Sequence, residues 1–146
     1  MVWAGSPGHE SDDRRSVPLQ LLKPLVEGSR CRFVSLQVGP KALEINAMGF
    51  AGKIEEMGSR LVDFADTASV LASLDLLISV DTAVVHLAGA LGQPVWVLLP
   101  FVPDWRWQLE RKDSVWYSSV RLYRQPSPGD WLSVIEAAMR DLLKHE

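Results

Sequence analysis

An aspartate, a threonine and a histidine follow an apolar segment of this chain at a spacing that can bind an anion. The run Leu74 to Ile78 is typical of a buried strand, and the polar residues of 79–82 behind it can begin a helix. A helix start carries backbone N–H groups without intrahelical partners, and the helix dipole is positive there. His86 is one turn further on, on the same face as Thr82, and can donate to the same anion. The anion site predicted here consists of Asp81, Thr82, Ala83 and His86.

A second interpretation of the same stretch is a well-capped core helix without a ligand. In that case Asp81 or Ser79 satisfies the first backbone donors, and His86 is a polar residue near the surface. The spacing alone leaves both interpretations open.

The elements around this motif predict a parallel sheet. A helix of small residues follows Thr82, then Gly92, and then a second apolar run from Val95 to Leu99. Strand, helix and strand joined by short loops form a βαβ unit, which indicates an α/β fold. The predicted anion site then lies at the carboxyl end of a strand, which is the edge where open parallel sheets bind ligands.

The rest of the chain continues the alternation of strands and helices. Strands are predicted at Val2–Ala4, Arg32–Gln37, Leu61–Phe64, Leu76–Ser79, Pro94–Leu99 and Val120–Tyr123. Helices are predicted at Val17–Val26, at Lys41–Met48, from an Asp66-Thr67 cap through Leu74, and at Trp131–Lys144 behind an Asp130 cap. The charged stretch His9–Ser16 is expected to be a mobile loop. A strand that begins at residue 2 suggests a chain that starts where a longer protein continues backwards.

The string Asp-Thr-Ala-x-x-His-Leu-Ala-Gly-Ala-Leu-Gly-x-Pro resembles the donor-binding motif of heptosyltransferase-type glycosyltransferases, the family nine type. It is most similar to the glycosyltransferase-like domains that follow tetratricopeptide repeats in bacterial proteins. The resemblance implies that this loop and helix start hold the diphosphate of a nucleotide-sugar.

Three further blocks extend this resemblance: Val-Trp-Ala-Gly-Ser-Pro at the start, Phe-Val-Ser-Leu-Gln, and Pro-Asp-Trp-Arg-Trp. Their order is similar to the carboxyl-terminal half of a GT-B glycosyltransferase. It implies that residues 1–146 form one nucleotide-sugar-binding domain, a Rossmann-like three-layer α/β/α fold with a mostly parallel sheet. On this resemblance, the amino-terminal domain, which in GT-B enzymes supplies the acceptor site and usually the catalytic base, is expected to lie outside these residues.

Other candidate donor-binding residues lie where predicted strands end. The loop with Gly5 and Ser6 lets backbone approach a phosphate, although it also fits an ordinary turn. Arg14 or Arg15 matches the basic residue that the resembled families use to neutralise the diphosphate, and at least one of them is expected to be solvated. Gln37 can hydrogen-bond a ribose or base, or simply end its strand.

Two more segments belong to the predicted ligand edge. The stretch Phe64–Thr67 resembles the wall beside a nucleobase. Asp104 and Arg106 lie on a long loop and are candidates for a sugar-diphosphate contact or a lid, whereas Trp105 and Trp107 are expected to anchor that loop to the core.

Composition limits the classes of partner. The formal net charge of −3 does not favour nucleic acid, and no stretch is apolar enough to cross a membrane. The one cysteine, Cys31, fits a reducing compartment and is expected to be structural, and the N-terminus lacks a signal peptide, so we expect a cytoplasmic location. The histidines do not have metal-ligand spacing, and neither a metal nor a cofactor is predicted.

The sequence therefore predicts a hexosyl- or heptosyl-transferring, glycosyltransferase-like domain that is inactive or weakly active alone, with no catalytic base identified. The alternative is a non-catalytic nucleotide-binding or protein-interaction module. A homodimer is expected, through the loop side with Trp105 and Trp107 or through the sheet edge, because the side that faces a partner domain in GT-B enzymes is uncovered.

Overall fold

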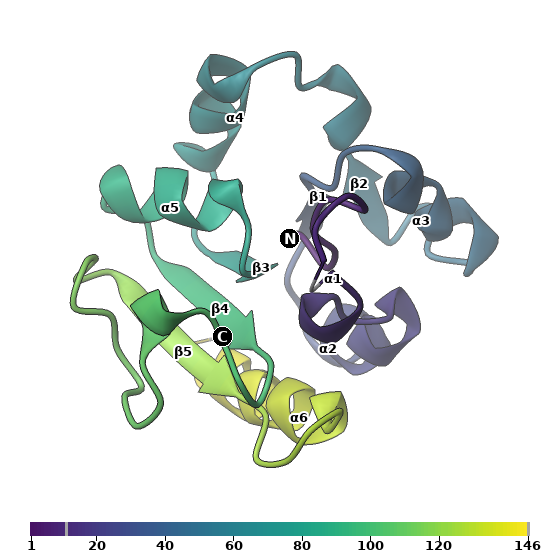
Figure 1. The fold of residues 1–146 in the computed structure, drawn as a ribbon. Helices are drawn as coiled ribbons and strands as arrows, with labels where there is room; N and C mark the ends of the chain where they lie inside the picture. Colours follow the sequence, from purple (N-terminus) through teal and green to yellow (C-terminus); the bar gives the residue numbers. More distant parts are fainter. Residues whose placement is uncertain (11, 146) are drawn as a thin grey trace.

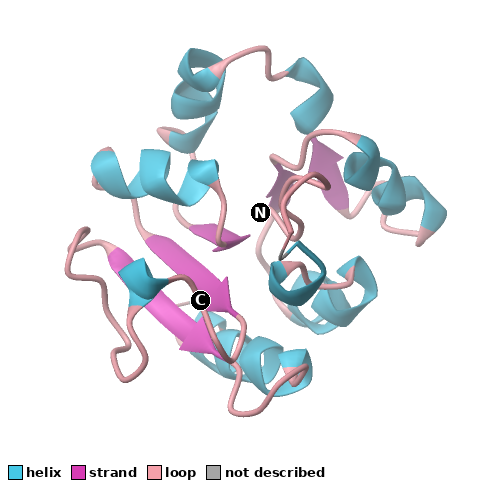
Figure 2. Ribbon diagram, in the orientation of Figure 1, coloured by secondary structure: helices cyan, strands magenta, loops and turns pink. Residues whose placement is uncertain are grey.

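The computed structural model describes residues 1–10 and 12–145. The strands in this part are β1 (Phe33–Ser35), β2 (Ile54–Glu56), β3 (Leu77–Val80), β4 (Val95–Leu99) and β5 (Val120–Arg124). The α-helices are α1 (Asp12–Arg15), α2 (Lys23–Gly28), α3 (Glu44–Ala47), α4 (Phe64–Leu71), α5 (Ala83–Ala90) and α6 (Trp131–Leu142). Short 3₁₀ turns lie at Leu19–Leu22, Pro40–Leu43, Gly58–Arg60 and Trp105–Trp107. Strands and helices alternate along most of the chain (Figure 2).

The first residues of the chain connect two groups of parallel strands. β1 pairs with β2, and β3, β4 and β5 pair in that order, all in parallel. Between the two groups, Val2 forms a parallel bridge with Ser79, and the Met1 carbonyl accepts from the Leu36 N–H at 3.0 Å. The spatial order is therefore β2, β1, the first segment, β3, β4, β5. With strands counted along the chain this is 3-2-1-4-5-6, the order of the Rossmann fold.

Helices cover both faces of these strands, which makes three layers (Figure 1). On one face, Leu25 of α2 and Ile135 of α6 belong to the same apolar cluster as Ile78 and Leu98. On the other face, α4 and α5 contribute to a second cluster, which also contains Leu77, Val97 and Trp107. Neighbouring strand residues enter opposite clusters because side chains alternate across a strand. The predicted α/β, Rossmann-like class is confirmed.

One predicted strand is wrong. Leu61–Phe64 is not a strand: Asp63 is the N-cap of α4, and its carboxylate accepts from the Asp66 N–H at 2.9 Å. The third strand is β2, before this point. The helix cap predicted at Asp66-Thr67 is therefore wrong by one turn, because Asp63 supplies the cap and Asp66 donates to it. As a result, Phe64–Thr67 begin a helix and do not end a strand.

Two segments of the first third also differ from expectation. The helix predicted over Val17–Val26 is divided into a 3₁₀ turn and α2, with Pro24 in the first turn of α2. Proline lacks the N–H that a continuous helix needs there, so the chain has to begin a new helix. The loop predicted over His9–Ser16 contains the single turn α1; residue 11 of that stretch lies outside the described residues.

Other predictions are confirmed closely. β4 covers the predicted apolar run, β5 lies where a last strand is predicted, and α6 begins behind Asp130, whose carboxylate accepts from the Ser133 N–H at 3.0 Å. The glycine predicted to end α5 is in the left-handed conformation, with φ of 71° at Gly92. The N–H groups of Gly92 and Gln93 donate to the carbonyls of Gly89 and Ala88, which is a Schellman motif.

Candidate functional site

The candidate site lies where the strand order reverses. The first segment and β3 are parallel neighbours, and from their shared carboxyl edge the chain continues to β1 on one side and to β4 on the other. In open α/β sheets this switch point leaves a crevice at the carboxyl ends of the strands, where ligands bind. The loop with Gly5 and the β3–α5 loop with Asp81 and Thr82 both begin there. The topology therefore brings two of the predicted site segments together.

The start of α5 does not have a side-chain cap. Thr82 is the N-cap residue, but its side chain makes no capping bond; its hydroxyl lies 3.3 Å from the Ser79 hydroxyl instead. The alternative interpretation, in which Asp81 or Ser79 satisfies the first backbone donors, does not match these contacts: Ser79 Oγ donates to the Val80 carbonyl, and the Asp81 carboxylate is directed to His86. The first N–H groups of α5, including that of Ala83, consequently lack a side-chain acceptor. This is the arrangement that an anion can complete.

His86 is held by groups from three different segments. Its Nε2 lies 3.7 Å from Asp81 Oδ1, and its Nδ1 lies 3.1 Å from the hydroxyl of Tyr117. The ring stacks on Trp107, with centroids 5.4 Å apart and planes 19° from parallel. Sequence reasoning missed Tyr117, because nothing in its local pattern indicates that the loop before β5 returns to α5.

Arg15 connects the Gly5 loop to the β3–α5 loop. Its Nη1 donates to the Asp81 carbonyl at 3.2 Å, and its Nε lies 3.3 Å from Asp12 Oδ1. Gly5 makes this approach possible, since a Cβ there would lie 2.4 Å from the Arg15 guanidinium and from the Asp12 carboxylate. Arg15 is thus placed at the switch point, although a bound anion has to share its guanidinium with Asp12.

The remaining residues of that first loop are more open. Arg14 and Ser6 are exposed, and the Ser6 carbonyl accepts from the His9 N–H at 3.0 Å. Of the two adjacent arginines, Arg15 is the one whose position the fold fixes, and Arg14 matches the expected solvated neighbour.

Gln37 lies at the switch point but is used by the backbone. Its side chain is 2% exposed; its Oε1 accepts from the N–H groups of Trp3 and Ala4, and its Nε2 donates to the carbonyls of Ala4 and Val38. These bonds replace a strand ladder where the first segment ends, so its side-chain amide organises the edge and has no remaining N–H for a ribose or base.

The long loop after β4 brings a different group to the surface. Asp104 Oδ1 accepts from Nη1 of Arg106 at 2.9 Å, and the guanidinium lies 5.2 Å from the Trp105 ring centroid. Trp105 also meets Trp116 edge to face, with centroids 6.3 Å apart. The sequence predicts that both tryptophans anchor this loop to the core. Trp107 does so at 1% exposure, whereas Trp105 is 70% exposed. Asp104 and Arg106 bind each other, and it is Trp107 of the same turn that stacks on His86.

Arg124 fixes this loop against the end of β5. Its guanidinium donates to the carbonyls of Trp107, Gln108, Leu109 and Arg111. Burial lowers the pKa of Arg124 from its usual value. The Arg124 hydrogen bonds hold a long irregular segment (Figure 2), and Trp107 of that segment stacks on His86.

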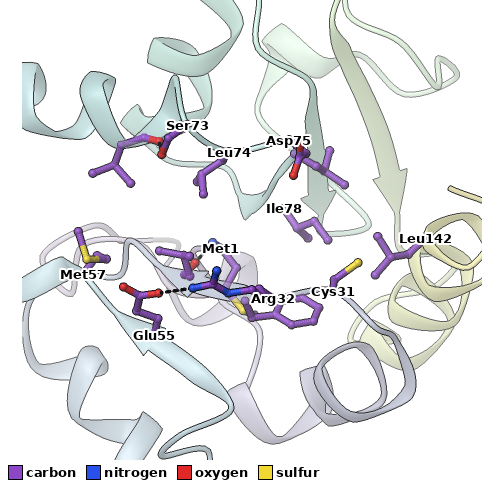
Figure 3. A pocket seen from close by; sticks show the side chains of 14 residues that line it. Met1, Cys31, Arg32, Glu55, Met57, Ser73, Leu74, Asp75, Ile78 and Leu142 are labelled. Atoms are coloured by element: carbon purple, nitrogen blue, oxygen red, sulfur yellow. Dashed lines mark hydrogen bonds and ion pairs between the residues drawn. The ribbon is translucent and has the colours of Figure 1, made fainter. Parts of the chain in front are cut away.

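A cavity of about 570 Å³ lies at the opposite edge of the sheet (Figure 3). Its walls include Met1, Leu74 and Ile78, and the Arg32–Glu55 ion pair at 3.4 Å borders it. None of the predicted site residues lines this cavity. Its lining mixes these apolar side chains with the charged side chains of Arg32, Glu55 and Asp75, and it lies away from the switch point.

The described residues do not bring three His, Cys, Asp or Glu side chains together as a metal ion requires. None of the helices in the part of the chain that the structure describes is long and apolar enough to cross a membrane.

Sequence comparisons relate part of this chain to a known family. The family model "Glycosyltransferase family 9 (heptosyltransferase)" matches residues 42–99, a range that contains Asp81, Thr82 and His86 but not the Gly5 loop, Arg15 or Tyr117. Protein FlbA of Caulobacter vibrioides is 29% identical over 153 aligned residues, which cover 97% of this chain and 24% of FlbA. The chain thus spans about a quarter of the length of that curated relative. No solved structure matches the chain. Over residues 42–99 the predicted resemblance to glycosyltransferase family 9 is confirmed.

Proposed function

We propose that this chain is a glycosyltransferase-like domain that binds a nucleotide-diphospho-sugar, with the diphosphate at the start of α5. The observation that carries the proposal is the position of the family-matched Asp-Thr-Ala-x-x-His block at the switch point of a 3-2-1-4-5-6 sheet. The uncapped helix start there has the donors and the dipole that favour negative charge.

In this proposal each group has a separate role toward the diphosphate. The first N–H groups of α5 donate to its oxygens, and His86 adds a side-chain donor one turn later. Arg15, fixed at the carbonyl of Asp81, contributes positive charge from the opposite loop, and exposed Arg14 can move in from solvent. Groups that stabilise a diphosphate more strongly as negative charge develops on it favour its departure from the sugar.

Transfer requires an acceptor site and a general base as well. Among the described residues, the carboxylates nearest the site are already paired, Asp12 with Arg15 and Asp81 with His86. We therefore infer that the chain alone transfers a hexosyl or heptosyl group slowly or not at all, and that a GT-B-type partner domain, such as one joined to tetratricopeptide repeats, completes the site. The exposed cysteine, Cys31, fits a reducing compartment such as the cytoplasm.

The exposed apolar side chains of the loop after β4 favour the alternative of an interaction module. Trp105, Trp116 and Val102 are 70%, 56% and 73% exposed. Clustered exposure of this kind marks interaction surfaces, and a two-fold homodimer is the simplest way to cover it. Light scattering over a concentration series tests this, with Trp105→Ser expected to shift the chain toward monomer; a strict monomer at high concentration contradicts the dimer.

A thermal-shift screen with uridine, guanosine, adenosine and cytidine diphosphates and their sugars tests the main proposal. Binding to the folded state raises the melting temperature by mass action. His86→Ala and Thr82→Trp should each remove about 1–3 kcal/mol of binding free energy for the ligand that the screen identifies. His145→Ala is the matched control, because the His145 ring lies against Trp96 of β4. Unchanged affinity in both site variants would reject the assignment.

A further inference from the structure

The hydroxyl of Tyr117 contacts His86 from a loop that the family match does not include. Tyr117 follows the matched range by eighteen residues, and its Oη lies 3.1 Å from Nδ1 of His86. The two rings are tilted by 60°, with centroids 5.8 Å apart, so the contact is made by the hydroxyl and not by stacking.

The Tyr117 ring packs against α5 at Gly89, which has no side chain. A Cβ at Gly89 would lie 2.6 Å from Tyr117 Cγ, so the ring occupies the space that any larger residue would fill. The Tyr117 backbone is also fixed, because its N–H is 3.3 Å from Ser114 Oγ and its carbonyl accepts from the Val120 N–H at 3.2 Å. The hydroxyl therefore meets His86 at a defined point.

Both ring nitrogens of His86 have partners of different chemistry. A carboxylate only accepts, so Asp81 Oδ1 at 3.7 Å favours a proton on Nε2. A neutral imidazole with its proton on Nε2 needs a donor at Nδ1, and the Tyr117 hydroxyl is in place to supply one.

We propose that Tyr117 is a positioning residue that holds neutral His86 in the tautomer with its proton on Nε2. That nitrogen is the one on the Asp81 side, toward the loop that begins α5. The inference rests on the proposed function for its ligand. While the Tyr117 hydroxyl donates to Nδ1, the proton of His86 is on Nε2, and Nε2–H can donate to the diphosphate oxygens at the helix start. Trp107 stacked on the ring supports the same orientation from the core.

Nitrogen-15 NMR of the imidazole rings tests the tautomer without any ligand. Spectra of the wild-type chain are compared with Tyr117→Phe, and His86→Ala identifies the His86 signals among the three histidines. Tyr123→Phe is the matched control, because it removes the other tyrosine hydroxyl, which donates to Asp141. We expect wild type and Tyr123→Phe to show the Nε2–H form, and Tyr117→Phe to show a mixture. The same tautomer in all three proteins overturns the proposal.

A double-mutant cycle tests the consequence for binding, with the nucleoside diphosphate that the screen identifies as the probe. Tyr117→Phe should weaken its affinity about threefold to tenfold, the effect of one neutral hydrogen bond. In a His86→Ala background the same change should have no further effect, because Tyr117 acts through His86. An equal loss in both backgrounds overturns the positioning role. If no nucleoside diphosphate binds the wild type, the proposed function fails, and the NMR comparison still decides the tautomer.

Discussion

The start of α5 differs from the starts of α4 and α6, although all three have an aspartate within two residues of the first helical turn. Asp63 accepts from the Asp66 N–H and closes α4, and Asp130 accepts from the Ser133 N–H and closes α6. At α5 the aspartate is one residue too early and is directed to His86, while Thr82 makes no capping bond.

The starts of α4 and α6 have side-chain caps that stabilise the helix, whereas the first N–H groups of α5 have no side-chain acceptor. The carboxyl end of α5 is closed by a Schellman motif at Gly92, so the helix is not poorly formed in general. Of the two ends of α5, the one at the switch point is the one whose backbone groups lack a closing motif. We interpret the open start as the cost of a ligand site, since a side-chain cap and an anion compete for the same N–H groups.

The largest expected change in the free energy of unfolding follows removal of Trp107, the side chain that stacks on His86 of α5. Trp107→Ala deletes a side chain that is 1% exposed and should lower the free energy of unfolding by about 3–5 kcal/mol. Trp105→Ala, at 70% exposure in the same turn, should change it by about 0.5 kcal/mol or less. Urea denaturation measures both variants. Similar losses would mean that the two tryptophans do not have the different roles assigned to them.

An intermediate effect is expected at a closed helix start. Asp63→Ala removes the side-chain acceptor of α4 and should reduce the free energy of unfolding by about 1 kcal/mol. Diphosphate affinity should stay at the wild-type value, because the removed carboxylate accepts from an N–H group of α4 and not of α5. Denaturation and calorimetric titration of this variant measure the two quantities separately, and a loss of affinity would contradict the division between the helix starts.

The smallest effect concerns the pH dependence of the α6 cap. The Ser133 N–H, followed by the Ser133 hydroxyl, holds the pKa of Asp130 below its usual value of 3.8. Its contribution to stability is therefore complete above that value and is lost as the pH falls through the lower pKa of the folded state. The difference in the free energy of unfolding between Asp130→Asn and wild type should narrow as the pH falls below about 4, as followed by urea denaturation at decreasing pH. A constant difference would contradict the role of the ionised cap.

The sequence predicts well those parts in which local pattern and burial agree. The apolar run of β4 lies between β3 and β5, Asp130 caps the start of α6, and Gly92 follows the end of α5 as capping chemistry requires. The strand predicted at Leu61–Phe64 failed because a short apolar run does not distinguish a strand from a helix start, and the nearby Asp63 cap decides for the helix.

Within the candidate site, the sequence predicts at which edge of the sheet a residue lies better than it predicts which groups that residue contacts. Strand ends bring the Gly5 loop, Gln37 and Asp81 to one edge, because the carboxyl ends of parallel strands meet there. It does not indicate that Gln37 is saturated by backbone, or that Tyr117 returns to His86 across thirty-one residues. Such contacts depend on where a long loop packs, and hydrophobic periodicity contains no information about that.

Installing a cap on α5 tests most directly the claim that its open start is an anion site. Thr82→Asp places a carboxylate at the N-cap, where it can accept from the free N–H groups and repels a bound anion. Isothermal titration with the nucleoside diphosphate identified by the screen should show an affinity at least about tenfold weaker than wild type, in a protein that is no less stable to urea. Thr82→Ser, which keeps the hydroxyl without the charge, should bind as wild type does. Wild-type affinity in Thr82→Asp would contradict the account.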